Sequence, residues 1–296
     1  MGRLIFLLLI GISAVSTASI FIKLCDAPSL IIAAYRMIFA SLLLTPFVAF
    51  QKRRLGMGTI RLRGYLLLSG FFLGLHFAFW IGSLKYTSVA SSVVLVSTNP
   101  IFVGIGGWLF LRERLNLNLI FGILFTVLGS VFISLGDTAI SKEALLGDGL
   151  ALLGAVSVSG YLLIGSRMRR DHDLLSYIFP VYSTAALLLV FLSLLFQKPF
   201  GGYSSSTYVF MFLIALIPQL IGHTTFNWAL KYLPASMVAI AILGEPIGST
   251  ILAYFILNEG LTLWKMIGGV LIFAGIVIAL RRAAEEKVST EVIREG

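Results

Sequence analysis

Residues 84–133, LKYTSVASSVVLVSTNPIFVGIGGWLFLRERLNLNLIFGILFTVLGSVFI, decide the fold, because they recur without a gap 146 residues later as residues 230–279. The two copies share LKY at 84–86 and 230–232, PI at 100–101 and 246–247, and ExLxL at 113–117 and 259–263. Thirteen of the fifty positions are identical. This is more than a shared apolar composition gives, so the chain is a doubled unit.

The composition of the whole chain is that of an integral membrane protein. Apolar residues make up 58% of the 296 positions, charged residues only 12%, and the mean hydropathy is +1.00. A soluble domain is about half apolar and one quarter charged. Because a helix needs about 20 apolar residues to cross a bilayer, we predict ten spans, roughly at 4–22, 30–50, 64–84, 88–111, 117–136, 147–167, 174–196, 207–230, 235–257 and 261–281.

Little sequence remains outside these spans, so the chain has no room for a soluble catalytic or nucleic-acid-binding module. The first 22 residues lack a clear small-residue cleavage site, and we interpret them as a retained first span. Cys25 is the only cysteine, which excludes an internal disulfide and a thiolate metal site. We expect no metal and no cofactor.

Basic residues predict the orientation. With a cytoplasmic amino terminus, sixteen Lys and Arg residues lie inside and four outside, a strong positive-inside bias. We therefore expect a multi-pass plasma membrane protein, in a bacterial cell the inner membrane, with both termini in the cytoplasm. The inside set is Arg3, Lys52, Arg53, Arg54, Arg61, Arg63, Arg112, Arg114, Arg167, Arg169, Arg170, Lys231, Arg281, Arg282, Lys287 and Arg294; the outside set is Lys23, Lys85, Lys142 and Lys198.

Five spans per unit is an odd number, so the second copy must enter the membrane from the opposite side. We predict an all-α integral membrane protein of ten transmembrane helices, built as two inverted five-helix repeats. The first repeat covers residues 1–140, the second covers 141–282, and 283–296 form a short cytoplasmic tail. Inverted halves can exchange roles and open the protein alternately to each side.

The fourth and ninth spans each carry a proline near the middle. Pro100 follows Asn99, and Pro246 follows Glu245 at the matching place. Proline removes a hydrogen-bond donor and clashes with the preceding turn, so we expect a kink at each position. Interrupted helices at corresponding places in two inverted halves point to a transport site. The alternative for Asn99 is that its amide only satisfies the broken backbone.

Two charged residues lie within spans. Glu245 is the only acidic residue deep in any span, and an intramembrane charge is costly unless it is paired or faces water. It is a candidate for proton coupling or for binding a substrate amine, although it could instead bond the amides freed at the kink. Arg36, next to Tyr35 in the second span, either faces a cavity or extends along its own stem to the membrane surface.

Polar residues share helix faces in the third and eighth spans. Phe72, His76 and Trp80 are four residues apart, and so are Gln219, His223 and Asn227. The two histidines lie at nearly equivalent depths in opposite halves, which favours a position along the pathway. A buried packing role is the alternative for each.

Other shared residues are interpreted as scaffold. Glu113 and Glu259 precede the fifth and tenth spans, where a carboxylate stabilises the positive end of the helix dipole. Gly122 and Gly129, like Gly268 and Gly275, are two turns apart and allow close helix packing.

The chain resembles the EamA-type transporters of the drug/metabolite transporter superfamily over nearly its whole length. The resemblance is carried by Asn99 to Phe102, by residues 111–115 with Gly122 and Gly129, and by the second copy at 244–247 and 257–261 with Gly268, Gly269 and Gly275. It implies ten spans, a central cavity and alternating access. In different relatives the substrates are amino acids, purines, sugars, nucleotide conjugates or drugs, commonly exported.

Our leading hypothesis is a secondary transporter, gradient-driven or facilitative, that exports a small polar, amino-acid-like metabolite. Arginine would bind a carboxylate, Glu245 an amine, and Trp80 an apolar or aromatic side chain. The expected partners are that substrate, the lipid bilayer and, where transport is proton-coupled, protons, and the expected assembly is a monomer. The alternatives are a lipophilic-cation exporter, a passive channel and an intramembrane enzyme, for which no reactive motif is present. The predicted substrate-binding residues are Tyr35, Arg36, His76, Trp80, Asn99, His223, Asn227 and Glu245.

Overall fold

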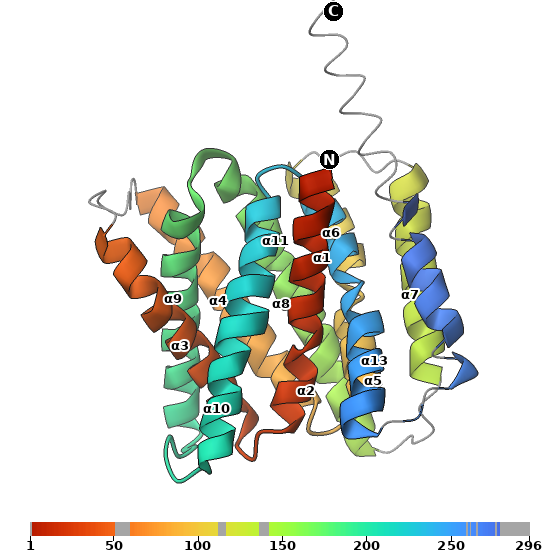
Figure 1. Ribbon diagram of the computed structural model, residues 1–296. Helices are drawn as coiled ribbons and strands as arrows, with labels where there is room; N and C mark the ends of the chain where they lie inside the picture. Colours follow the sequence, from red (N-terminus) through yellow and green to blue (C-terminus); the bar gives the residue numbers. More distant parts are fainter. Residues whose placement is uncertain are drawn as a thin grey trace, which may run out of the picture.

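The computed structural model describes residues 2–50, 60–111, 117–135, 142–258, 260, 262–264, 266–275 and 277–278. Within these residues the secondary structure is helical, and the helices stand side by side along one common direction (Figure 1). This confirms the all-α membrane class. Glu113, Glu259 and the tail 283–296 lie outside the described residues.

The elements follow the predicted spans closely. Their bounds are α1 Gly2–Ser16, α2 Ala18–Lys23, α3 Ser29–Phe50, α4 Ile60–Ser83, α5 Val89–Val96, α6 Asn99–Gly106, η1 Gly107–Leu111, α7 Leu117–Leu135, α8 Lys142–Asp171, α9 Leu174–Leu195, α10 Ser205–Ile214, η2 Ala215–His223, α11 Thr224–Ala229, α12 Ala235–Ile242 and α13 Glu245–Leu257.

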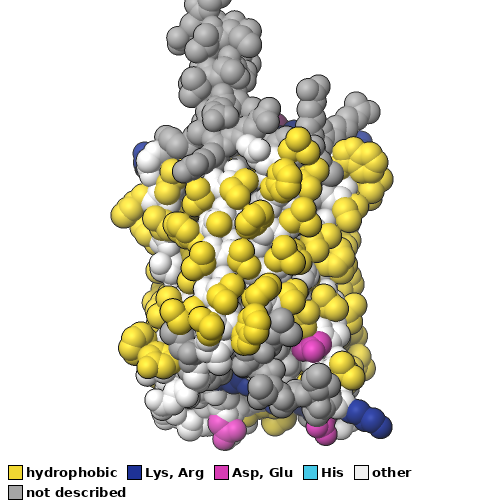
Figure 2. Space-filling view, turned by 90° about the vertical axis from the view of Figure 1, so that its right-hand side faces the viewer, with side chains coloured by type: hydrophobic (Ala, Val, Ile, Leu, Met, Phe, Trp, Pro, Cys, Tyr) yellow, Lys and Arg dark blue, Asp and Glu magenta, His cyan; other side chains and the backbone are white. Residues whose placement is uncertain are grey.

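Eight helical segments are long and apolar enough to cross a membrane. Two shorter apolar helices, Ile120–Gly129 within α7 and Met266–Gly275, correspond to the predicted fifth and tenth spans. The count of ten spans therefore stays a prediction. Figure 2 shows apolar side chains over the middle of one face and charged groups toward its ends, as expected for a surface that contacts lipid.

Several spans are interrupted at residues that disturb the helical hydrogen-bond ladder. Thr17 separates α1 from α2, and its hydroxyl donates to the Ala14 carbonyl at 2.8 Å. In the predicted eighth span, η2 is a nine-residue π-helix that contains Pro218. Proline lacks the N–H that the regular ladder needs, and π segments are frequent at functional sites. The residue pattern of this span did not predict a π-helix.

Helices pack closely where a glycine leaves no side chain between two backbones. A Cβ on Gly70 of α4 would lie 2.7 Å from the Val181 carbonyl oxygen of α9. A Cβ on Gly129 of α7 would lie 2.5 Å from the Gly268 carbonyl oxygen. These contacts allow the backbones to approach directly, and α7 accordingly stands beside the helix Met266–Gly275 in Figure 1.

Candidate substrate site

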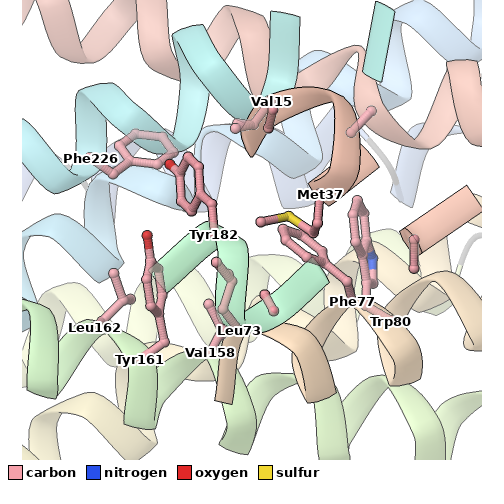
Figure 3. Close-up of a cluster of buried hydrophobic side chains, with 14 of the residues drawn as sticks. Val15, Met37, Leu73, Phe77, Trp80, Val158, Tyr161, Leu162, Tyr182 and Phe226 are labelled. Atoms are coloured by element: carbon pink, nitrogen blue, oxygen red, sulfur yellow. The ribbon is translucent and has the colours of Figure 1, made fainter. Parts of the chain in front are cut away.

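A cavity lies between the helices, lined by residues from both parts of the chain. It is bordered by α1, α2, α3, α4, α8, α11 and the π-helix η2. The pairs α5/α6 and α12/α13, which form the predicted fourth and ninth spans, also border it. Its polar lining is Arg36, His76, Trp80, Ser97, Asn99, His223 and Glu245, and its apolar lining is Val15, Ala18, Val96, Val158, Phe226 and Ile242. Figure 3 shows four of these, Val15, Trp80, Val158 and Phe226, converging from different helices.

Arg36 of α3 is the cationic group of the cavity, and its side chain is 0% exposed. Its Nε donates a hydrogen bond to Gln219 Oε1 at 2.8 Å, and its guanidinium lies 3.9 Å from the centre of the Phe77 ring. Among the described residues, neither Nη1 nor Nη2 has a hydrogen-bond partner. The side chain therefore does not extend to the membrane surface, and two strong donors remain for a ligand.

The two histidines lie together although they come from different halves of the chain. Their ring centres are 6.3 Å apart. His76 Nδ1 lies 3.0 Å from the Gly154 carbonyl oxygen, so it must carry the proton of this hydrogen bond. The His76 ring also stacks on Trp80, with 5.8 Å between centres and 8° between planes. In the neutral form of the ring, Nε2 is then the acceptor.

The two helix breaks bring Asn99 and Glu245 to the cavity. The helix α5 ends at Val96 and α6 begins at Asn99, while α12 ends at Ile242 and α13 begins at Glu245. Each proline is the second residue of the helix that follows the break. Asn99 is 3% exposed, and its Oδ1 has no hydrogen-bond partner in the part of the chain that the structure describes, so the amide oxygen does not satisfy the backbone freed there.

Glu245 is 8% exposed and occupies the first turn of α13, where the helix dipole favours a negative charge. It is close enough to Arg36 for the two charges to interact. Among the described residues, however, no ion pair joins these two groups. Arg36, whose terminal nitrogens have no hydrogen-bond partner among the described residues, and the carboxyl group of Glu245 thus both line the same cavity.

Two of the eight predicted residues lie outside this cavity. Tyr35 is next to Arg36 in the sequence, but successive residues on a helix point in different directions. Its hydroxyl donates to the Phe200 carbonyl at 2.7 Å. Asn227 is fully buried, and its Nδ2 donates to Tyr161 Oη at 2.5 Å and to the His223 carbonyl at 2.8 Å.

Several residues that contribute to the site were not among the predicted ones. Gln219 shares a helix face with His223, and Ser97 belongs to the interrupted segment, so a sequence signal was present for both. Phe77 and the apolar wall carry no such signal, because apolar residues are abundant in every span. Among the described residues, no group of three or more His, Cys, Asp or Glu side chains is arranged to hold a metal ion.

Comparison with known proteins places the chain in a family. The model of the EamA-like transporter family matches residues 2–135 and again 145–281. An uncharacterized transporter of Archaeoglobus fulgidus is 27% identical over 255 residues, covering 83% of this chain and 86% of the relative. The uncharacterized transporter YxxF of Bacillus subtilis is 25% identical, covering 76% and 72%.

The fold also matches a solved crystal structure at 17% identity, with a TM-score of 0.79 over 96% of this chain and 99% of that one. This likeness concerns the fold alone. Family and relatives together indicate a small-molecule substrate and a lipid environment, and they are transporters rather than enzymes. The chain belongs to the EamA-like transporter family and is a multi-pass membrane transporter.

Proposed function

We propose that the protein is a secondary transporter that carries a small zwitterionic, amino-acid-like metabolite by alternating access. The observation that carries this proposal is the pair of opposite charges at one cavity, Arg36 with two unpartnered terminal nitrogens and Glu245. An arginine can hold a carboxylate through two parallel hydrogen bonds. Glu245 can accept from the ammonium group of the same molecule.

Energetics support a ligand with both charges. A buried charge without a partner is costly in a membrane. A zwitterion offsets this cost at both groups at once, whereas a lipophilic cation would meet Glu245 but be repelled by Arg36. Trp80 and the apolar wall would then contact the substrate side chain. Protons that reach Glu245 could compete with the ammonium group and couple transport to a pH gradient.

The proposed mechanism uses two inverted halves, residues 1–140 and 141–282. In it, α7 is the fifth span and the helix Met266–Gly275 is the tenth. Support for this arrangement comes from the two similar helix breaks at the cavity. Support for cytoplasmic termini comes from the basic residues at helix ends. Arg3 and Arg61 belong to the first turns of α1 and α4 and Arg170 to the last turn of α8, whereas Lys23 ends α2 and Lys142 begins α8. We infer export across the plasma membrane.

Counterflow in proteoliposomes tests the proposal. Purified protein is supplied with radiolabelled amino acids, purines, sugars or organic cations, with and without a pH gradient. We expect saturable exchange of amino acids, and loss of this exchange in Arg36→Met. Selective exchange of organic cations would support the alternative drug exporter. Flux that never saturates would indicate a channel and contradict alternating access.

A further inference from the structure

Gln219 touches the cationic group of the site without lining the cavity. Its side chain is fully buried in the π-helix η2, and its Oε1 accepts the hydrogen bond from Arg36 Nε at 2.8 Å. Only the amide oxygen can accept from this donor, which places the amide nitrogen on the other side. Its contact with the residues that line the cavity is the hydrogen bond to Arg36.

The contact at Nε determines which edge of the guanidinium is available. A guanidinium is planar and offers one edge that includes Nε and another formed by Nη1 and Nη2. Gln219 occupies the Nε donor, and the Phe77 ring, 3.9 Å from the guanidinium carbon, restricts the plane of the group. The edge that remains is the one with both unpartnered nitrogens, which suits bidentate binding of a carboxylate.

The choice of an amide also matters for charge. A glutamate at this position would form an ion pair with Arg36 and compete with an anionic ligand. An apolar residue would leave Nε unsatisfied and allow the guanidinium to rotate. Glutamine holds the group through a neutral acceptor and leaves its positive charge available.

We propose that Gln219 is a positioning residue that orients Arg36 and thereby sets the preference of the site for a carboxylate over an uncharged group. This inference rests on the proposed function for its effect on transport. The geometric part, in which Gln219 holds the Nε–H of Arg36, can be measured without any ligand.

The first test is the exchange of the Arg36 Nε–H proton with solvent. Protein labelled with ¹⁵N-arginine is studied by NMR, and the signal is assigned by its absence in Arg36→Lys. We expect Gln219→Met, which has a similar volume but no acceptor, to exchange this proton about 10-fold faster, as loss of one hydrogen bond to a charged group implies. Unchanged exchange and an unchanged chemical shift would overturn the assignment. If Gln219→Met does not fold, Gln219→Glu replaces it, with a changed shift expected from the new ion pair.

The second test is substrate selectivity in proteoliposomes. Transport of an amino acid is compared with transport of its α-carboxamide, which keeps the ammonium but lacks the carboxylate. We expect Gln219→Met to lower the preference for the carboxylate about 10-fold, mainly through KM, and Gln219→Glu to lower it further. A merely structural role would lower both rates together and leave their ratio unchanged, and that result would contradict the proposal.

The two proposals fail in different ways. If the wild-type protein exchanges no amino acid, the proposed function fails while the NMR measurement still decides the role of Gln219. If amino acids are exchanged and the ratio does not respond to either substitution, the role of Gln219 fails alone.

Discussion

The two helix breaks at the cavity share a backbone design and differ in their chemistry. Both α5 and α12 are eight residues long, two residues separate each from the following helix, and proline is the second residue of that helix. The residue before the proline is Asn99 in the first half and Glu245 in the second. The two breaks thus have the same backbone arrangement but different polar side chains at the cavity.

The divergence sets the charge balance of the site. With Arg36 as the cation and Glu245 as the carboxylate, the formal charges of these two groups sum to zero, which matches a zwitterion. A glutamate at both breaks would leave one negative charge in excess, and an asparagine at both would leave one positive charge. The balance of charge therefore depends on the difference between the two breaks.

Glu245→Gln makes the two breaks alike in charge and should have the largest effect. We expect uptake of the zwitterion to fall about 30-fold or more, because Arg36 then lacks a counter-charge and the ammonium loses its acceptor. Initial rates in proteoliposomes measure this effect, and Asn99→Gln, which keeps an amide at the other break, is the matched control. Gradient-driven accumulation that survives Glu245→Gln unchanged would show that Glu245 is scaffold.

Exchanging the two residues moves the carboxylate to the first half without changing the charge balance. We expect the double variant Asn99→Glu/Glu245→Asn to transport about 10-fold faster than Glu245→Asn alone, because it restores the charge balance with the carboxylate at a different position. The double-mutant cycle is read from kcat/KM. A double variant that transports less than Glu245→Asn would contradict the interpretation that the breaks are equivalent in position.

Asn99→Ala removes the unpartnered amide oxygen while leaving the charges in place. We expect a rise in KM of about 3- to 10-fold, the range for one neutral hydrogen bond to a ligand, with little change in kcat. Thr98→Ala is a suitable comparison, because the Thr98 hydroxyl donates to the Leu95 carbonyl of its own helix at 2.7 Å. An equal effect in both variants would assign Asn99 to the backbone rather than to the substrate.

Pro100→Ala and Pro246→Ala should have the smallest effects on binding. Each restores a backbone N–H at the start of a helix, where proline is well tolerated and the missing donor has no partner in its own helix. We expect KM to change by less than about 3-fold in either variant, since no side chain at the cavity is altered. A loss specific to one half would show that the two breaks move differently during transport.

Much of the candidate site was predictable because its signals are unusual within a membrane span. A lone arginine, a lone carboxylate and two histidines stand out against apolar helices, and these four line one cavity. The remaining lining residues are ordinary apolar side chains such as Val15 and Val158. Their position depends on how each helix is rotated about its axis, and neighbouring helices decide this rotation.

The sequence by itself determined the helical membrane class, the positions of the spans and the places where two of them break. These properties are local, because they depend on runs of about 20 apolar residues and on prolines. Only the tertiary structure decided that Arg36 faces the cavity while Tyr35 bonds to Phe200, and that Gln219 rather than Asn227 contacts Arg36. Such contacts join residues far apart in the chain, and the packing of whole helices fixes them.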